Sequence, residues 1–324
     1  MKKVKQKDLL NNKIMINGKK VSVLVAFICN PYLAVLFKRM YLKYWKDEID
    51  ELLVNVNGRN DKIRKFIVDL YKDDDKVKII NEVQGEIRQG HAFDNMYHEA
   101  TGDIIITMDS DNFVYKKGVI GEFCKKLDEF DSIGSFGFHA YPGKIGDMCI
   151  QKYGTARLNP FMAFFKTGII DQMTEVSFKT KAFKKDDFFE YLGTMPDDGW
   201  LDVMTPFCLK YFNLANNKFK IPESQDGEYH HFSCVSSLYR RCFTSLEDGN
   251  TQVYEKTGNV KQNINNWRNY YILYELTKDE VPFKEYNEQF ELGFNYELEK
   301  ADIKIEQVKT QLELFKKNNE GMFI

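Results

Sequence analysis

The segment Ala100-Thr101-Gly102-Asp103-Ile104-Ile105-Ile106-Thr107-Met108-Asp109-Ser110-Asp111 decides how this sequence is interpreted. Its apolar, β-branched run from Ile104 to Met108 predicts a short buried strand. Two carboxylates follow, and on an ideal strand Asp109 and Asp111 would point to the same face. Carboxylate oxygens suit a hard divalent cation such as Mg²⁺ or Mn²⁺, which could hold a diphosphate. Open α/β folds bind ligands at this carboxyl edge of the sheet. The segment therefore predicts a site for a metal-bound phosphate compound.

An acidic pair after a strand also has a simpler explanation. Asp and Ser side chains accept hydrogen bonds from backbone N–H groups, so they are common in turns and at helix N-termini. The Asp-x-Asp pattern alone does not separate a turn from a metal site. The choice between a turn and a metal site depends on the sequence that flanks the acidic pair.

Strand and helix patterns alternate through the first part of the chain. Strands are predicted at residues 21–27, 52–56, 77–80 and 104–108, and helices at 33–45, 62–71 and 92–100. This spacing is typical of a parallel sheet with right-handed crossovers, so the fold class is α/β.

The pattern loosens after residue 115. We expect a helix at 119–130, a strand at 159–165, a helical or extended segment at 207–214, and charged helices within 290–317. The organisation predicted from these patterns is a polar leader (1–20), an α/β half (21–115), a second half of the same domain (116–245) and a mainly helical C-terminal region (246–324).

Composition excludes several classes of protein. A hydrophobic fraction of 43% with 15% aromatic residues indicates a globular chain. The formal charge of -2 argues against an obligate duplex nucleic-acid partner. The charged N-terminus leads into no apolar core of a signal peptide, and the apolar run Val21–Cys29 is too short to span a bilayer. The six cysteines form no Cys-x-x-Cys pair, so we expect neither a zinc site nor a disulfide framework. Scattered cysteines fit a reducing compartment, so we expect a cytoplasmic location.

The order of these features resembles the GT-A glycosyltransferases, in particular the family-2-like group that uses nucleotide-sugar donors. The segment Ala100-x-Gly102-Asp103, followed by Asp109-x-Asp111, matches that group well. The resemblance implies a Rossmann-like, mostly parallel central sheet flanked by helices, with a helical C-terminal extension. Asn57 stands where the family usually has Asp; it can still accept a hydrogen bond from a base or ribose. Asp94 occupies a position usually held by Asn.

The resemblance also implies a set of donor contacts. The residues concerned are Ala26, Phe27, Asn57, Arg88, His91, Asp94, Asp109, Ser110 and Asp111. In the family a histidine near a Ser-rich stretch is a frequent third metal ligand, and His231 is the better aligned of the His230-His231 pair. An imidazole ligand favours Mn²⁺ over Mg²⁺.

A downstream acidic motif implies the catalytic base. Asp197-Asp198-Gly199-Trp200-Leu201 matches the family's Glu/Asp-Asp-x-x-Leu spacing, in which the second acid is the base of inverting enzymes. Asp198 would then deprotonate the acceptor hydroxyl, and Asp197 would bind the acceptor or act in its place. Trp200 would stack on a sugar ring or anchor the loop. Pro196 to Gly199 is also a good β-turn sequence.

The resemblance thus implies a metal-dependent, inverting glycosyltransferase that uses a nucleotide-sugar, with a UDP-sugar as the preferred donor; Asn57 leaves the nucleotide open. The acceptor stays open among a glycan, a protein, a lipid-linked sugar and a modified nucleobase. One alternative is a nucleotidyltransferase of related fold, although the segment Phe27–Tyr32 lacks the Gly-rich basic loop of that class. Another is a non-catalytic nucleotide-sugar-binding or assembly protein. In that case residues 296–317 could form a partner helix for oligomerisation, or pack their apolar residues on the main body.

Overall fold

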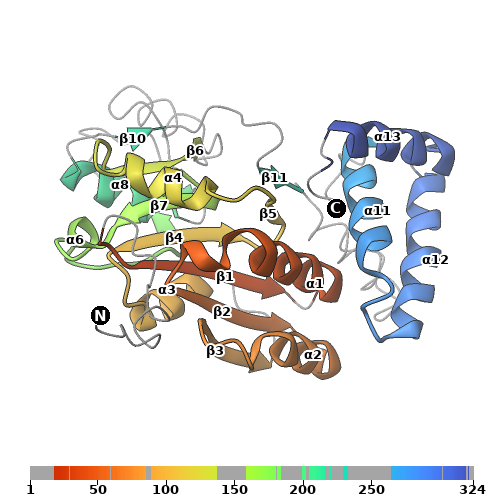
Figure 1. Ribbon diagram of the computed structural model, residues 1–324, viewed down its shortest axis with the longest axis horizontal. Coiled ribbons are helices and arrows are strands. Elements are labelled where there is room, and N and C mark those ends of the chain that lie inside the picture. The colour runs from red at the N-terminus through yellow and green to blue at the C-terminus, as the bar shows by residue number, and fades with distance from the viewer. Residues whose placement is uncertain are drawn as a thin grey trace, which may run out of the picture.

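The protein is built around a seven-stranded sheet (Figure 1). The computed structural model describes residues 18–28, 30–58, 60–84, 89–136, 158–179, 181–183, 199–201, 204–215, 219–220, 229–232, 264–300, 302–318 and 320. The sheet order is β10-β6-β7-β4-β1-β2-β3, and only β7 runs antiparallel to its neighbours. The strands are β1 (Val21–Ile28), β2 (Glu51–Gly58), β3 (Val77–Gln84), β4 (Ile104–Asp109), β6 (Ser132–Phe136), β7 (Leu158–Lys166) and β10 (Phe219–Lys220). The mostly parallel sheet expected from the sequence is confirmed.

Helices cover both faces of this sheet, as the alternation of side chains along the strands requires. Along β1, Val21, Val23, Val25 and Phe27 join one core with α1, α2 and α4, whereas Leu24 and Ala26 join a second core with α3 and α8. The bounds of these helices are α1 (Pro31–Met40), α2 (Asp61–Tyr71), α3 (Gln89–Glu99), α4 (Val119–Lys126) and α8 (Thr205–Leu214). A short α6 (Thr167–Ile170) follows β7.

Two asparagines begin the helices that follow β1 and β2. Asn30 Oδ1 accepts from the backbone N–H of Leu33 at 3.1 Å, with Pro31 in the first turn. Asn60 Oδ1 accepts from the N–H of Ile63 at 3.1 Å. These N-caps satisfy backbone donors that the helix leaves unpaired. Both helices therefore start immediately beyond the carboxyl edge of the sheet.

The structure settles the predictions that the sequence pattern left open in the second half of the chain. The segment 207–214 is helical, within α8, and the expected strand at 159–165 is β7. The predicted helix at 33–45 divides into α1 and a π-helical turn, Tyr41–Trp45, followed by a 3₁₀ turn, Lys46–Glu48. The sequence pattern did not single out α11 (Ile264–Thr277), because its buried residues mix Ile272 and Leu273 with polar or amphipathic ones: Asn269, Tyr270, Tyr274 and Thr277.

A buried carboxylate joins three segments at the amino edge of the sheet. Glu51, at the start of β2, accepts hydrogen bonds from Ser22 Oγ (2.6 Å) and from the N–H of Thr101 (2.5 Å). Lys78 Nζ on β3 lies 2.5 Å from its other oxygen. A Cβ on Gly102 would come within 2.4 Å of Ser22 Oγ, so the close approach requires glycine. Gly102 of the family-like motif therefore has a structural role far along the strand from the acidic pair.

Three C-terminal helices stand together beyond the carboxyl ends of β1 and β2, at the right of Figure 1. They are α11, α12 (Lys284–Lys300) and α13 (Ile305–Asn318). Leu298, Val308 and Leu312 are buried in the same core as β1, as the packing alternative predicted; oligomerisation through this region stays a prediction. No helix in the described part of the chain has the length and apolar character needed to cross a membrane.

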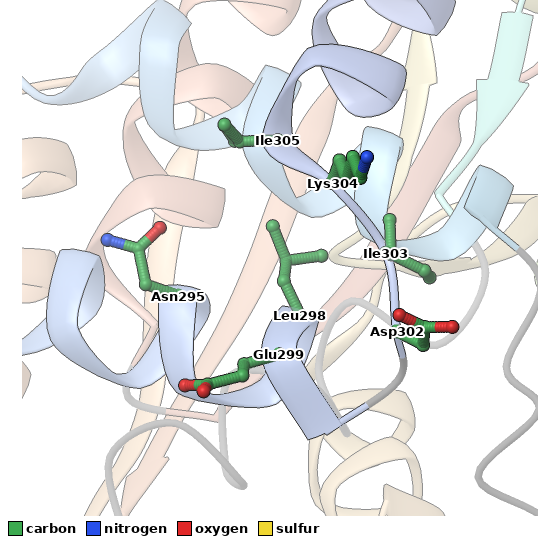
Figure 2. Close-up of a pocket in the computed structure, with 7 residues that line it drawn as sticks. All are labelled: Asn295, Leu298, Glu299, Asp302, Ile303, Lys304 and Ile305. Carbon is green, nitrogen blue, oxygen red and sulfur yellow. The ribbon is translucent and has the colours of Figure 1, made fainter.

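A shallow pocket lies at the junction of α12 and α13 (Figure 2). Its lining comprises Asn295, Leu298, Glu299 and the four residues 302–305. None of the residues predicted for donor, metal or acceptor belongs to this lining. The functional site has to be sought at the sheet edge.

Candidate metal and donor site

A small antiparallel ladder brings His231 to the acidic pair. β4 ends at Asp109, and after a two-residue turn the chain continues as β5 (Asn112–Val114). β11 (Tyr229–His231) pairs with β5, with His231 opposite Asn112. The N–H of Phe232 donates to the carbonyl oxygen of Asp111 at 2.7 Å, which extends the ladder past the turn. Residues about 120 positions apart are thereby fixed side by side.

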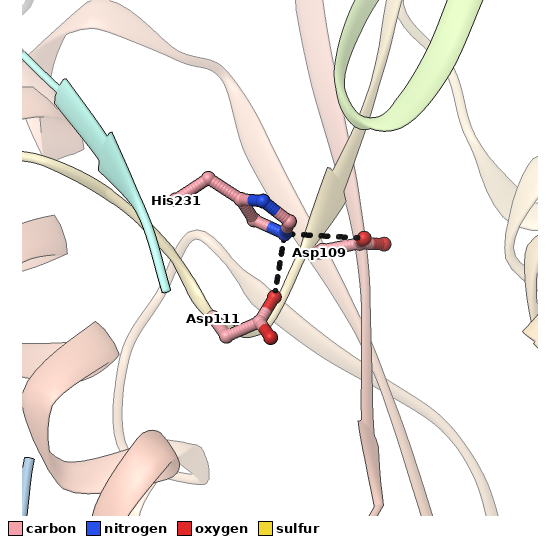
Figure 3. Close-up of side chains that lie close together, drawn as sticks. All are labelled: Asp109, Asp111 and His231. Atoms are coloured by element: carbon pink, nitrogen blue, oxygen red, sulfur yellow. Dashed lines mark ion pairs between the residues drawn. The ribbon is translucent and has the colours of Figure 1, made fainter. Parts of the chain in front are cut away.

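Asp109, Asp111 and His231 converge on one point (Figure 3). His231 Nε2 lies 3.1 Å from Asp111 Oδ1 and 3.8 Å from Asp109 Oδ2. One ligand atom from each residue falls within 4.8 Å of the others. Two carboxylates and an imidazole form a donor set that can hold a divalent cation. The turn explanation and the metal explanation are compatible, since Ser110 and Asp111 form a turn within the cluster.

The acidic pair also raises the pKa of the histidine. Burial acts to lower the pKa of His231, but the charges of Asp111 and Asp109 and the hydrogen bond to Asp111 outweigh it and raise the pKa. An imidazole must lose its proton to ligate a metal, so protons and a cation compete for this position.

The strand register places the donor candidates in a row at the sheet edge. Ala26 pairs with both Asp109 on β4 and Asn55 on β2, and Ile28 pairs with Asn57. Paired residues of parallel strands point to the same face, so Ala26, Asn55, Asn57 and Asp109 share the face covered by α3. Phe27 points to the opposite face.

The Phe27 ring therefore points away from the site, so its predicted donor contact could be made only by its backbone and stays a prediction. Its ring is fully buried and lies 5.4 Å from Phe37 and 5.7 Å from Tyr71. Successive side chains of a strand point to opposite faces of the sheet, so the neighbour of a residue on the site face points into the core. The neighbouring Ala26 is on the site face and is 8% exposed.

Asn57 has an unused acceptor. Its Nδ2 donates to Asn55 Oδ1 at 3.2 Å, and Asn55 Nδ2 in turn donates to the carbonyl of Ile80 at 3.0 Å. Asn57 Oδ1 is buried and accepts no hydrogen bond from the described residues. A buried hydrogen-bond acceptor that has no partner costs free energy of folding. A bound ligand that donates a hydrogen bond to Asn57 Oδ1 would remove this cost.

The residues of α3 divide between the site and the scaffold. Gln89, in its first turn, donates from Nε2 to Asp109 Oδ1. His91 is exposed on the same turn. Asp94 accepts from the N–H of Phe178 at 2.6 Å and from Ser177 Oγ at 3.2 Å, so the contacts found for it fasten a loop to α3. Its predicted donor role stays a prediction.

Other predicted residues lie outside the described residues: Arg88, Asp197 and Asp198. Trp200 lies on β9 (Gly199–Leu201), which pairs with β8 (Lys181–Phe183) opposite Ala182. Sequence reasoning missed Gln89, Asn55 and Phe232. A polar residue inside the apolar run of β2 was the available signal for Asn55; nothing local marked the other two.

Comparison with known proteins gives a family and a set of distant structures. The model of glycosyl transferase family 2 matches residues 22–189, and no curated protein matches the chain. A mannosyltransferase from Pyrobaculum calidifontis, solved with GDP-Man and Mn²⁺, has 13% identity over 92% of this chain and 84% of its own, with a TM-score of 0.42. The 1–349 segment of TarS from S. aureus, with UDP-GlcNAc, has 13% identity over 93% and 92%, with a TM-score of 0.42.

Glucosyl-3-phosphoglycerate synthase from Mycobacterium tuberculosis has 12% identity over 64% of this chain and 70% of its own, with a TM-score of 0.39. The assignment rests on the family match, which spans more than half of the 324 residues and includes Asp109 and Asp111. It confirms the resemblance seen in the sequence and favours a glycosyltransferase over the nucleotidyltransferase alternative. The chain belongs to glycosyl transferase family 2.

Proposed function

We propose that this glycosyltransferase moves a sugar from a nucleotide-sugar donor to an acceptor hydroxyl in a metal-dependent reaction. The observation that carries the proposal is the convergence of Asp109, Asp111 and His231 at the carboxyl edge of β4. Only tertiary structure joins the histidine to the acidic pair, and the three groups match a divalent cation in charge and ligand type.

In this proposal each side chain at the edge has a definite task. Asp109, Asp111 and His231 hold Mn²⁺ or Mg²⁺, with Mn²⁺ preferred because imidazole is a ligand. The bound cation supplies neutralisation of the charge that develops on the leaving diphosphate. Gln89 orients the Asp109 carboxylate through its hydrogen bond. Ser110, in the turn between the two acids, lies beside the diphosphate.

The nucleoside would lie along the β1–β2 side of the edge. Asn57 Oδ1 would accept a hydrogen bond from the base or the ribose, a contact for which its unpartnered acceptor is available. The N–H of a uracil ring could supply that bond, and the preference for a UDP-sugar as donor comes from the resemblance to the family. Arg88 and His91 are proposed for the pyrophosphate.

The chemical step proposed is inverting transfer with Asp198 as general base. A carboxylate there would take the proton of the acceptor hydroxyl as it attacks the anomeric carbon. Asp197 and Trp200 are proposed to bind the acceptor. A non-catalytic donor-binding protein would share the metal site but show no turnover.

Thermal unfolding with a panel of donors tests the proposal. UDP-, GDP-, CMP- and dTDP-sugars are added with and without Mn²⁺ to the wild type and to Asp109→Ala/Asp111→Ala. A ligand that binds only the folded state raises the melting temperature by mass action. We expect a Mn²⁺-dependent rise with UDP-sugars that the double variant loses. A rise of equal size in the double variant, or none with any donor, would overturn the metal-dependent function.

A further inference from the structure

The helices α11, α12 and α13, here called the C-terminal unit, are anchored on the segments that follow β1 and β2. Tyr32 Oη, in the first turn of α1, donates to Asn287 Oδ1 at 2.7 Å. Asn60, the cap of α2, donates to the Tyr286 hydroxyl, and the Phe66 and Phe283 rings lie 5.4 Å apart. The unit therefore has a fixed position relative to the sheet edge.

A third contact reaches the metal cluster. The Phe315 ring on α13 lies 6.0 Å from the ring of Phe232, which immediately follows His231. The Phe232 ring also packs edge to face on the ring of Phe113 of β5, with the two ring centroids 5.2 Å apart. Arg268 on α11 places its guanidinium 4.8 Å from the centre of the Phe315 ring. Phe232 is fully buried in this stack and Phe315 is 6% exposed.

The backbone of Phe232 connects this stack to two of the three candidate ligands. Its N–H donates to the carbonyl of Asp111, and its peptide bond joins it to His231. β11 is only three residues long, so ladder hydrogen bonds alone fix His231 weakly. A shift of the Phe232 ring would move the imidazole and the Asp111 carbonyl together.

We infer that Phe315 is a positioning residue of the metal site, through which the C-terminal unit holds His231 against Asp109 and Asp111. This inference rests on the metal-binding function proposed above. It assigns the C-terminal unit a task in the donor site, although the unit lies outside the segment that matches the family.

The test is Mn²⁺ affinity, measured on the full chain with Mn²⁺ alone by the EPR signal of the free ion. Loss of groups that orient metal ligands typically weakens metal binding by 10–100-fold, so we expect Phe315→Ala to weaken it by about tenfold. Phe315→Tyr, which keeps the ring against Phe232, is expected to bind Mn²⁺ with nearly the affinity of the wild type. All titrations are made at a temperature where circular dichroism shows the variants folded.

Phe294→Ala is the matched control. Phe294 is 2% exposed in the same unit, and its ring contacts include Tyr270, Tyr271 and Phe290. The variant loses a buried ring of the same size, so we expect it to lower the melting temperature while it binds Mn²⁺ like the wild type. This control separates loss of stability from loss of ligand position.

The outcomes distinguish the two proposals. Equal Mn²⁺ binding by the wild type and by Asp109→Ala/Asp111→Ala, or no binding by either, would refute the metal site, and the inference would fall with it. Binding that the double variant loses but Phe315→Ala retains would refute only the inference. Equal weakening in Phe315→Ala and Phe294→Ala would also refute it, because general destabilisation would then explain the effect.

Discussion

Replacement of Glu51 by Gln tests the buried junction that holds the family-like motif to the sheet. The Glu51 side chain is 8% exposed and bonds Ser22, Thr101 and Lys78. Gln keeps the size, and its carbonyl oxygen can still accept from both Ser22 and Thr101, which bond the same carboxylate oxygen, Oε1. Its NH₂ group replaces Oε2 and cannot accept from Lys78. The substitution therefore removes the charge and at least one charge-assisted hydrogen bond without opening a cavity.

The expected cost follows from these contacts. A hydrogen bond to a charged group contributes about 1.5–3 kcal/mol. The Lys78 partner is 45% exposed, so solvent screens the ion pair and its share is small. The main cost is that the hydrogen bonds from Ser22 and Thr101 lose the charge of their acceptor, which weakens each by about 1 kcal/mol. We therefore expect a loss of about 2 kcal/mol in the free energy of unfolding at pH 7. For a chain of 324 residues, whose unfolding entropy is about 2.1 cal/mol/K per residue, that loss lowers the melting temperature by roughly 3 °C.

The same junction predicts a dependence on pH. Burial acts to raise the pKa of Glu51, but the hydrogen bonds from Lys78, Ser22 and Thr101 outweigh it and lower the pKa below its usual 4.5. A carboxyl whose pKa is lowered in the folded state stabilises above its unfolded pKa, and this stabilisation is lost as the pH falls through the folded value. The stability difference between wild type and Glu51→Gln should be constant from neutral pH to about 5 and shrink below pH 4.5.

Urea unfolding of both proteins, at pH 7 and at steps down to the lowest pH where both refold, measures this difference. Other carboxylates titrate in both proteins and cancel. A difference near zero at pH 7 would refute the hydrogen-bond argument. A full difference that persists unchanged below pH 4.5 would refute the assignment of its origin to the Glu51 charge.

Three further changes probe the site and its scaffold. Asn57→Ala removes the acceptor proposed for the nucleobase or ribose. Calorimetry should show UDP binding weakened by about tenfold, as expected for the loss of one good hydrogen bond. Unchanged binding would show that the nucleoside does not contact Asn57. Asp198→Asn should abolish turnover of the donor, measured as release of the nucleotide, while the donor-induced thermal shift persists; retained turnover would remove Asp198 as the base. Gly90→Ala should lower the free energy of unfolding by about 1–3 kcal/mol in chemical unfolding. The reason is that its Cβ would lie 2.6 Å from the Phe178 carbonyl oxygen and from the Lys179 Cα. Unchanged stability would show that the segment with Phe178 and Lys179 can move aside.

Local pattern accounted for the first half of the fold because its elements are regular. The β-branched runs of β1, β2 and β4 are buried on both faces, and the helices between them bury one stripe. The π-helical turn at Tyr41–Trp45 and helix α11 escaped prediction, because they are fixed by tertiary contacts: the Tyr41 hydroxyl donates to Asp74, and the Tyr270 ring packs on Phe290 of α12.

The sequence by itself determined the α/β class, the carboxyl-edge position of Asp109 and Asp111, and the family. These follow from side-chain periodicity and from short motifs, which depend on neighbours along the chain. The family resemblance already implied His231 as a partner of the acidic pair, and the structure brings the three together. Only the tertiary structure decided that Phe27 faces the core, that Gln89 meets Asp109, and that α13 reaches Phe232. Those contacts join segments tens to hundreds of residues apart. Their formation depends on how packed layers and strand register bring the segments together, and no local pattern encodes that geometry.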